Sequence, residues 1–214
     1  MIFMTETIGI DDMGRMIRSA ADLIRANRDD LSKLDSAIGD GDHGMTIARA
    51  MGIAEKVIAE SDKKELKGLL KDVGWGVMGV DGGATGPLLG SFLMGLGNGI
   101  DELETIDCPT LAVMFEAGLA GVRRQSKAQI GDKTLMDALF PAVDAFRQAA
   151  DEGKSIKEAL HDAAKAAENG ATSTKEFKAR FGRAKNLGDR TIGCQDPGAT
   201  SMALIFQGFF EGLA

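Results

Sequence analysis

The sequence predicts an all-α protein. Apolar residues recur at helical spacing along most of the 214 residues, as in helices that each bury one face. Strand signals are weak, because tyrosine is absent, aromatic residues make up 5%, and no run of β-branched residues alternates with polar residues over strand length. Prolines also stand where helices begin, since Pro109 follows Cys108, and Pro197 follows Asp196, a residue type that caps helix N-termini.

The helices can be placed in order along the chain. The first is predicted over about residues 13–24, with an apolar stripe of Met13, Met16, Ile17, Ala20, Ala21 and Ile24. A short helical stretch precedes Asp35. Further stripes predict helices over about residues 45–58, 66–80, 87–96, 111–122, 135–150, 156–167 and 197–213. The total is roughly eight or nine helices, and Pro141, inside one stripe, should end or kink its helix.

A single domain over residues 1–214 is predicted, because the length suits one core and no linker rich in Ser, Pro or Gly divides the chain. Hydrophobic residues make up 44% and charged residues 27%, which is typical of a soluble globular protein. No fixed-period repeat indicates a solenoid. The economical architecture is a closed antiparallel helical bundle.

The composition also excludes several kinds of partner. A net charge of -7 argues against a nucleic-acid partner or an anionic membrane, since both need a positive face. The N-terminus does not resemble a secretory signal, and no apolar run reaches the ~18 residues of a membrane span. Cys108 and Cys194 are too few for a disulfide framework or a zinc quartet. Reduced thiols and a cytoplasmic location are therefore expected, and a homodimer is compatible with the sequence.

The strongest chemical signal is an acidic loop, Asp35-Ser-Ala-Ile-Gly-Asp-Gly-Asp-His-Gly44. Asp35, Asp40 and Asp42 would repel one another without a cation between them. Residues two apart in an extended loop share a side, so Asp40 and Asp42 can face one ion while Asp35 approaches from the preceding helix end. Hard oxygen ligands of this kind suit Mg²⁺ or Ca²⁺. The glycines allow a phosphate to approach the main chain, and a helix that begins beyond them can meet an anion.

This loop has other interpretations. An isolated Asp-Gly-Asp is more often an exposed turn that caps a helix, but Asp35 and the helix entry at His43 favour a metal site. An EF-hand starting at Asp40 would need ligands at Gly44 and Met51, which supply none from their side chains. The Gly-Asp-Lys-Thr sequence at residues 131–134 interrupts the pattern of a P-loop. That segment is equally explained as a turn and cap before a helix.

Two further glycine-rich loops precede predicted helices. Residues 79–87, Gly-Val-Asp-Gly-Gly-Ala-Thr-Gly-Pro, include Thr85 as a hydroxyl donor, and residues 187–200 open the last helix at Pro197. Near the latter loop, Arg183 and Arg190 are candidate hydrogen-bond donors to a phosphate group. Glycines can equally mark close helix packing, and a single arginine is more often a solvated surface residue. His161, on a polar helix face, is expected to be exposed.

These motifs together resemble the L subunit of dihydroxyacetone kinase, the DhaL family. The match comprises residues 34–44, Gly-Gly-Ala-Thr-Gly-Pro-Leu at 82–88, Gly-Asp-Lys-Thr at 131–134 and Gly-Cys-Gln-Asp-Pro-Gly-Ala-Thr at 193–200. The resemblance implies a closed barrel of about eight antiparallel amphipathic helices, with a nucleotide at one end. It implies that Asp35, Asp40 and Asp42 hold a pair of Mg²⁺ ions. The implied contacts to ADP or ATP are His43, Gly44, Met45, Thr46, Ala84, Thr85, Ser126, Leu135, Arg183, Asp196, Pro197 and Gly198.

The resemblance further implies a phosphotransferase without a protein nucleophile. The phosphoryl group would pass through the Mg-nucleotide to dihydroxyacetone on a separate K subunit. In the phosphoenolpyruvate-dependent systems of the family, a phosphohistidine carrier of M type recharges bound ADP, whereas ATP-dependent relatives exchange the nucleotide. Lys185-Asn186 replaces a common Ser-Tyr and Cys194 a common His, which leaves the packing of the adenine end and the exchange rate open.

Three alternative functions remain open from the sequence. The chain could serve a kinase for a related ketose such as a tetrulose, since the acceptor would be selected on the partner. It could instead be a regulatory module whose nucleotide state is read by another protein. A Ca²⁺-stabilised structural bundle is the third alternative, although the acidic loop lacks the ligand series of an EF-hand.

Overall fold

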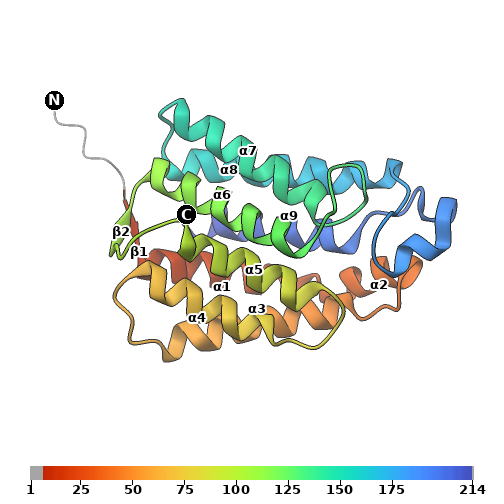
Figure 1. Cartoon of the computed structure of the whole chain (residues 1–214), viewed down its shortest axis with the longest axis horizontal. Coiled ribbons are helices and arrows are strands. Elements are labelled where there is room, and N and C mark those ends of the chain that lie inside the picture. The colour runs from red at the N-terminus through yellow and green to blue at the C-terminus, as the bar shows by residue number, and fades with distance from the viewer. Residues whose placement is uncertain (1–6, 214) are drawn as a thin grey trace.

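The computed structural model describes residues 7–213, and nearly all of the regular secondary structure in these residues is helical (Figure 1). Its α-helices are α1 (Ile10–Ala26), α2 (Arg28–Ile38), α3 (His43–Glu60), α4 (Leu66–Met78), α5 (Thr85–Asn98), α6 (Cys108–Gln125), α7 (Met136–Asp151), α8 (Ile156–Ser173) and α9 (Pro197–Glu211). Two 3₁₀ segments, η1 (Thr174–Glu176) and η2 (Arg183–Thr191), lie between α8 and α9. The predicted all-α class is therefore confirmed, and each predicted helix is present.

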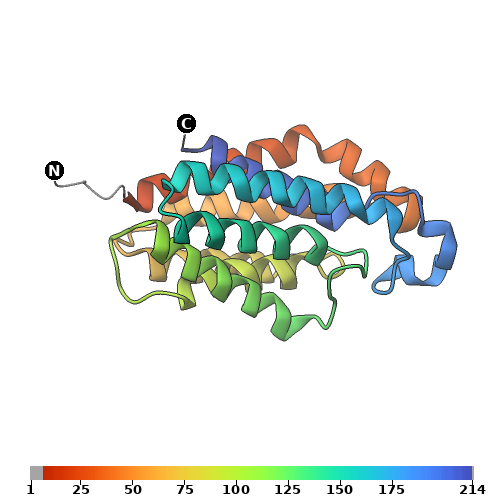
Figure 2. The ribbon, with the colours of Figure 1, turned by 90° about the horizontal axis from the view of Figure 1, so that it is seen from above.

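The contacts between helices close into a ring. Each helix from α3 to α8 packs on the next one in the chain, α9 packs on α1, and α1 packs on α3. Helix α2 lies outside this sequence of neighbours and packs against α3 and α9. The long helices run roughly along one axis in both views (Figures 1 and 2). This arrangement is consistent with the barrel that the family resemblance implies.

A contiguous apolar core fills the interior of the ring. The stripe predicted for the first helix is fully inside, since its members in α1 are all 1% exposed or less. Phenylalanines from four helices meet at the centre, where Phe115 packs edge-on against Phe146 with ring centroids 4.9 Å apart. Phe206 lies 5.4 Å from Phe115 by the same measure. Burial of these stripes is what holds the helices side by side.

The seam between α1 and α9 depends on small residues. A Cβ placed on Gly208 in α9 would lie 2.3 Å from Cα of Ala20 in α1, far inside van der Waals contact. The two backbones can approach this closely only because Gly208 has no side chain. This seam joins the first and last helices and so completes the ring.

Two details differ from or extend the sequence predictions. A two-residue antiparallel pair joins β1 (Ile8–Gly9) to β2 (Thr105–Ile106), which is too short to leave a sequence signal. Helix α7 continues through Pro141 to Asp151, so of the expected end or kink at this proline the end is excluded. No disulfide joins Cys108 and Cys194. Among the described residues, no helix has the length and apolar character needed to cross a membrane.

Candidate functional site

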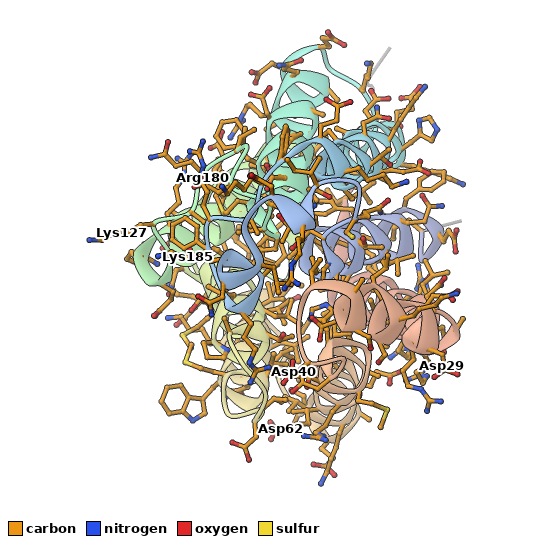
Figure 3. The ribbon with its side chains drawn as sticks, turned by 90° about the vertical axis from the view of Figure 1, so that its right-hand side faces the viewer. Asp29, Asp40, Asp62, Lys127, Arg180 and Lys185 are labelled. Atoms are coloured by element: carbon orange, nitrogen blue, oxygen red, sulfur yellow. The ribbon has the colours of Figure 1, made fainter. Side chains whose placement is uncertain are left out.

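The loops that carry the sequence motifs meet at one end of the helical ring, on the right in Figure 1. They surround a cavity of about 420 Å³, which is within the size range of small-molecule sites. Figure 3 looks onto this end of the molecule, where Asp40, Arg180 and Lys185 are labelled. The cavity walls come from the α2–α3, α4–α5 and α6–α7 connections, from η2 and from the start of α9.

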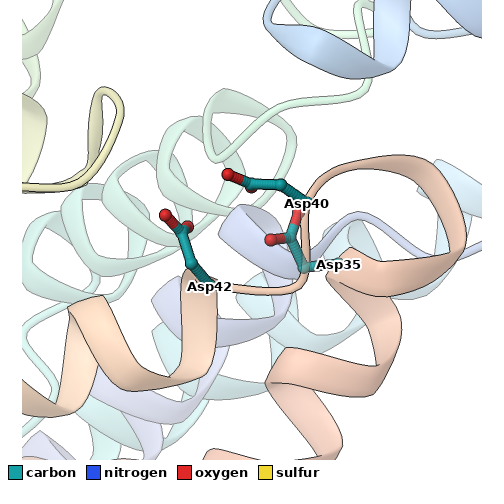
Figure 4. A group of neighbouring side chains, drawn as sticks. All are labelled: Asp35, Asp40 and Asp42. Carbon is teal, nitrogen blue, oxygen red and sulfur yellow. The ribbon is translucent and has the colours of Figure 1, made fainter.

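The acidic loop folds its three carboxylates toward one another (Figure 4). Asp35 lies in the last turn of α2, Asp40 in the connecting loop and Asp42 at the N-cap of α3, and one oxygen from each lies within 4.8 Å of the others. The backbone N–H of His43 donates to Asp35 at 3.2 Å, which fixes that carboxylate. Three converging hard oxygens match the ligand preference of Mg²⁺, so the residues fit a magnesium site.

A cation from another loop already approaches this cluster. The guanidinium group of Arg183, at the start of η2, forms an ion pair with Asp40. Their side chains are 60% and 41% exposed, so solvent screens the attraction. The pair brings η2 over the acidic loop, where Arg183 can reach an anion held beside the carboxylates.

His43 connects three of the loops through hydrogen bonds. Its Nε2 lies 3.0 Å from the hydroxyl of Ser201 in α9, and its Nδ1 lies 3.4 Å from the hydroxyl of Thr85 in α5. The hydroxyl of Ser201 also donates to the carbonyl of Gly198 at 3.0 Å, so the tautomer with the proton on Nε2, which donates to Ser201 and accepts from Thr85 at Nδ1, satisfies all of these groups. Burial lowers the pKa of His43, against the opposing effects of Asp35 and Asp42. A neutral imidazole fits both bonds.

The glycine-rich loop before α5 packs against the start of α3. Gly82 has a φ of +131°, and a Cβ at this position would lie 2.5 Å from the hydroxyl oxygen of Thr46. No other residue type fits both the backbone angle and the space. The chain then enters α5 at Thr85, so the free N–H groups of this helix open toward the cavity.

The third loop ends in a capped helix. The Asp196 carboxylate accepts from the N–H of Ala199 at 2.7 Å, and Pro197 is the first residue of α9, as the Asp-Pro sequence predicted. Asp196 is 9% exposed, and burial raises its pKa to about 7. Residues at the starts of α3, α5 and α9 thus line one cavity, and their helix dipoles favour an anion there.

Lys133 is the residue of this end that the sequence reasoning missed. The Gly-Asp-Lys-Thr segment is one of the family motifs and is equally explained as a turn and cap. The hydroxyl of Thr134 accepts from the N–H of Met136 at 3.2 Å, but the N-cap of α7 is Leu135, which makes no side-chain cap bond. Lys133, however, is only 2% exposed and donates to the carbonyl oxygens of Thr174 and Cys194. A lysine in a turn is usually solvated, so only its place between two glycine-rich motifs could have signalled this burial.

Most, but not all, of the predicted site residues line the cavity. The cavity is lined by most of the predicted set, namely Asp35, Asp40, Asp42, His43, Ala84, Thr85, Ser126, Leu135, Arg183, Asp196, Pro197 and Gly198. Gly44, Met45 and Thr46 are not among its lining residues; Met45 is 50% exposed, whereas Gly44 and Thr46 are buried. Arg190 is exposed and does not line the cavity either. His161 is exposed, as predicted, and contacts Asp162 and Phe210.

The cavity also has an apolar wall that the sequence did not distinguish from the core. Ile38, Leu88, Met202 and Ile205 line it from three helices, α2, α5 and α9, and Phe181 lines it from the segment before η2. The site therefore combines a carboxylate cluster, helix N-termini and apolar surface. Such a cavity can hold a molecule with a flat apolar part and a metal-bound phosphate tail.

Comparisons with known proteins agree with this chemistry. Residues 37–211 match the family described as the DAK2 domain. The chain is 36% identical over 197 residues to the ADP-binding subunit DhaL of PEP-dependent dihydroxyacetone kinase 1 from Listeria innocua, covering 92% of this chain and 93% of that protein. The corresponding subunit of PEP-dependent dihydroxyacetone kinase from Escherichia coli K12 is 38% identical over 187 residues, covering 87% and 89%.

A solved structure has the same fold. The dihydroxyacetone kinase from C. freundii in complex with AMP-PNP and Mg²⁺ aligns with a TM-score of 0.67 at 25% identity over 92% of this chain. This chain spans 33% of that longer protein. The shared region is thus one part of a larger kinase polypeptide.

Proposed function

Because the chain belongs to the DAK2 domain family, we propose that it is the ADP- or ATP-binding subunit of a dihydroxyacetone kinase. It would carry the phosphoryl group on a Mg-nucleotide and deliver it to dihydroxyacetone held on a separate K subunit. The names of the two DhaL relatives support a phosphoenolpyruvate-dependent system. In that system a phosphohistidine carrier subunit of M type would recharge the bound ADP.

One observation carries the proposal. Three carboxylates converge within 4.8 Å at the edge of a cavity that the starts of α3, α5 and α9 also line. A carboxylate cluster repels a bare phosphate, whereas helix N-termini attract it, so the two features are compatible only if a cation lies between them. A metal-bound nucleotide satisfies both at once.

The residues of the site would divide the work by their chemistry. Asp35, Asp40 and Asp42 would hold Mg²⁺, and a pair of ions is proposed. When bound, the metal neutralises phosphate charge and orients the transferred group. The N–H groups at the start of α9 would orient the phosphate chain, and Arg183 would bind an oxygen near Asp40.

The remaining cavity residues would place the nucleotide without reacting with it. Thr85, His43 and Ser201 hold the three loops in one geometry through their shared hydrogen bonds. Ala84, Ser126 and Leu135 would contact the nucleotide from neighbouring loops. Phosphoryl transfer of this kind depends on positioning and electrostatics, so no protein nucleophile is required.

Reconstitution tests the proposal. The purified chain is mixed with a K subunit, dihydroxyacetone and Mg²⁺, and the phosphorylated sugar is measured with either ATP or phosphoenolpyruvate plus carrier proteins as the phosphate source. Product that requires this chain supports the proposal, and the productive phosphate source identifies the system. Replacing dihydroxyacetone by a tetrulose tests the related ketose kinase in the same assay. Normal Mg-nucleotide binding with no product in any mixture would contradict the kinase role and favour a regulatory module.

A further inference from the structure

Lys133 occupies an unusual position in the wall of the candidate nucleotide site. Its backbone φ is +59°, and it is the one residue other than glycine with positive φ among residues 7–213. Its side chain is 2% exposed, yet it carries an ammonium group. A lysine adopts such a backbone and such burial only where surrounding contacts hold it there.

The ammonium group joins two segments that lie far apart in the sequence. Nζ donates to the carbonyl oxygen of Thr174 at 2.6 Å and to the carbonyl oxygen of Cys194. Thr174 begins η1 directly after α8, and Cys194 belongs to the glycine-rich loop before α9. The hydroxyl of Thr174 in turn accepts from the N–H of Asp196 at 2.9 Å. Lys133 and Thr174 therefore fix the backbone immediately before α9.

Asp196 is the charged group on which this arrangement acts. Its carboxylate caps α9 through the N–H of Ala199, at the helix start that lines the cavity. Burial raises the pKa of Asp196, and the positive charge of Lys133 opposes that rise. Desolvation lowers the pKa of Lys133, while Asp196 and Cys194 act in the other direction. Each of the two buried charges thus favours the ionised form of the other.

The other titratable groups around Asp196 are few. Asp137, from α7, is 1% exposed and raises the pKa of Asp196. Its carboxylate is already engaged, since it accepts from the N–H groups of Gly131 at 2.5 Å and Thr134 at 2.7 Å. Asp132 pairs with Arg180 at 3.3 Å. The imidazole of His43, from α3, lies beside the backbone of Pro197.

We propose that Lys133 is a positioning residue of the nucleotide site: it ties the loop before α9 to the start of η1 through the carbonyl oxygens of Cys194 and Thr174, and its charge favours the carboxylate form of Asp196, the cap of that helix. Lys133 acts through Asp196 and the α9 N-terminus, so it needs no direct contact with phosphate. This inference rests on the proposed nucleotide-binding function and deepens it. It assigns the lysine of the Gly-Asp-Lys-Thr segment to a role beyond that of a turn.

A purely structural lysine would behave differently from this positioning residue. Loss of packing or of hydrogen bonds alone weakens nucleotide binding by the same factor at every pH. Loss of the charge also shifts the ionisation of Asp196 to higher pH, so the deficit must vary with pH. The pH profile of the variant-to-wild-type affinity ratio separates the two, because titration of the nucleotide itself cancels in the ratio.

The experiment measures the Kd of Mg-ADP by calorimetry for the full chain and for K133M, K133Q and K165M, from about pH 6 to about pH 9. K133Q retains a hydrogen-bond donor without the charge, and Lys165 is an exposed lysine of α8 that serves as the matched control. K133M should bind roughly tenfold more weakly or worse near neutral pH, and the deficit should narrow as pH rises. K133Q should lose less affinity for Mg-ADP than K133M, and its loss should also become smaller as pH rises. K165M should bind Mg-ADP as the wild type does.

The contradicting outcomes are distinct. If the wild type binds Mg-ADP and the loss of affinity in K133M and K133Q is the same at every pH, the inference is overturned and the proposed function is left intact. Absence of Mg-ADP binding by the wild type would instead overturn the proposed function. If thermal melts show that both Lys133 variants fail to fold, D196N carries the test, because its affinity relative to wild type should change in a step near pH 7. A ratio without that step would contradict the role of Asp196 and, with it, of Lys133.

Discussion

Arg183 and Asp40 form an ion pair that links η2 to the acidic loop across the mouth of the cavity. Both side chains are substantially exposed, so the pair contributes little to folding stability. Its importance lies in its position, because Asp40 is also one of the three carboxylates that converge on the proposed metal site. A bound cation and the guanidinium group must therefore share this carboxylate or compete for it.

Replacing Arg183 should affect metal and nucleotide binding in opposite directions. In R183Q, Mg²⁺ alone should bind a few-fold more tightly, since no competing cation lies at Asp40. Mg-ADP should bind roughly tenfold more weakly, since a charge-assisted bond to phosphate is lost. Calorimetric titrations of each ligand measure both effects. R190Q, on the same segment but away from the cavity, is the control, and two effects of the same sign in R183Q would contradict this account.

The seam between α1 and α9 should tolerate no added methyl group. G208A would place its Cβ 2.3 Å from Cα of Ala20, so the helices must separate. We expect a loss of roughly 2 kcal/mol or more in the free energy of unfolding, measured by urea denaturation. In G52A the new Cβ meets no atom within 4 Å, and that variant should instead gain about 1 kcal/mol from helix propensity. Equal effects of the two substitutions would show that the seam is not closely packed.

The pH dependence of stability should report the burial of Asp196. Its pKa is raised from 3.8 to about 7 in the folded protein, which therefore holds this proton more tightly than the unfolded chain does. The resulting stabilisation is complete below about pH 4 and is lost as the pH rises to about 7. Between about pH 5 and pH 8 the wild type should lose roughly 2 kcal/mol relative to D196N, whose amide does not titrate.

Urea unfolding of both proteins at several pH values measures this difference. The substituted asparagine can still cap α9, so D196N should fold. D72N, which changes an exposed carboxylate of α4, serves as the control and should follow the wild type at each pH. A stability difference between D196N and wild type that does not vary with pH would mean that Asp196 titrates normally in the folded state.

The fold could be predicted from the sequence because the buried residues of amphipathic helices recur at helical spacing. The stripe from Met13 to Ile24 is wholly buried in α1, and the prolines at positions 109 and 197 mark helix starts as expected. At Pro141, where the sequence predicted an end or a kink, helix α7 does not end. A missing N–H in one turn disfavours a helix, but the packing of α7 between α6 and α8 carries the helix past it.

The candidate site was accessible only in part. Charge and spacing alone predicted that Asp35, Asp40 and Asp42 converge, because like charges so close in sequence need a cation. The apolar wall of the cavity could not be distinguished from the core in the sequence, since Ile205 has the same spacing as core residues of α9. The burial of Lys133 could not be predicted, because its hydrogen-bond acceptors are backbone carbonyls of distant segments, and any residue type can supply these.

The central claim is that the three carboxylates bind the metal of a Mg-nucleotide, and one calorimetric experiment tests it most directly. ADP is titrated into the wild type with Mg²⁺, into the wild type with a chelator, and into D42N with Mg²⁺, with D62N, an exposed aspartate after α3, as the control. We predict tight binding only with Mg²⁺, a loss of roughly tenfold or more in D42N, and wild-type affinity in D62N. Binding of ADP that is equally tight with the chelator, or unchanged in D42N, would contradict the claim.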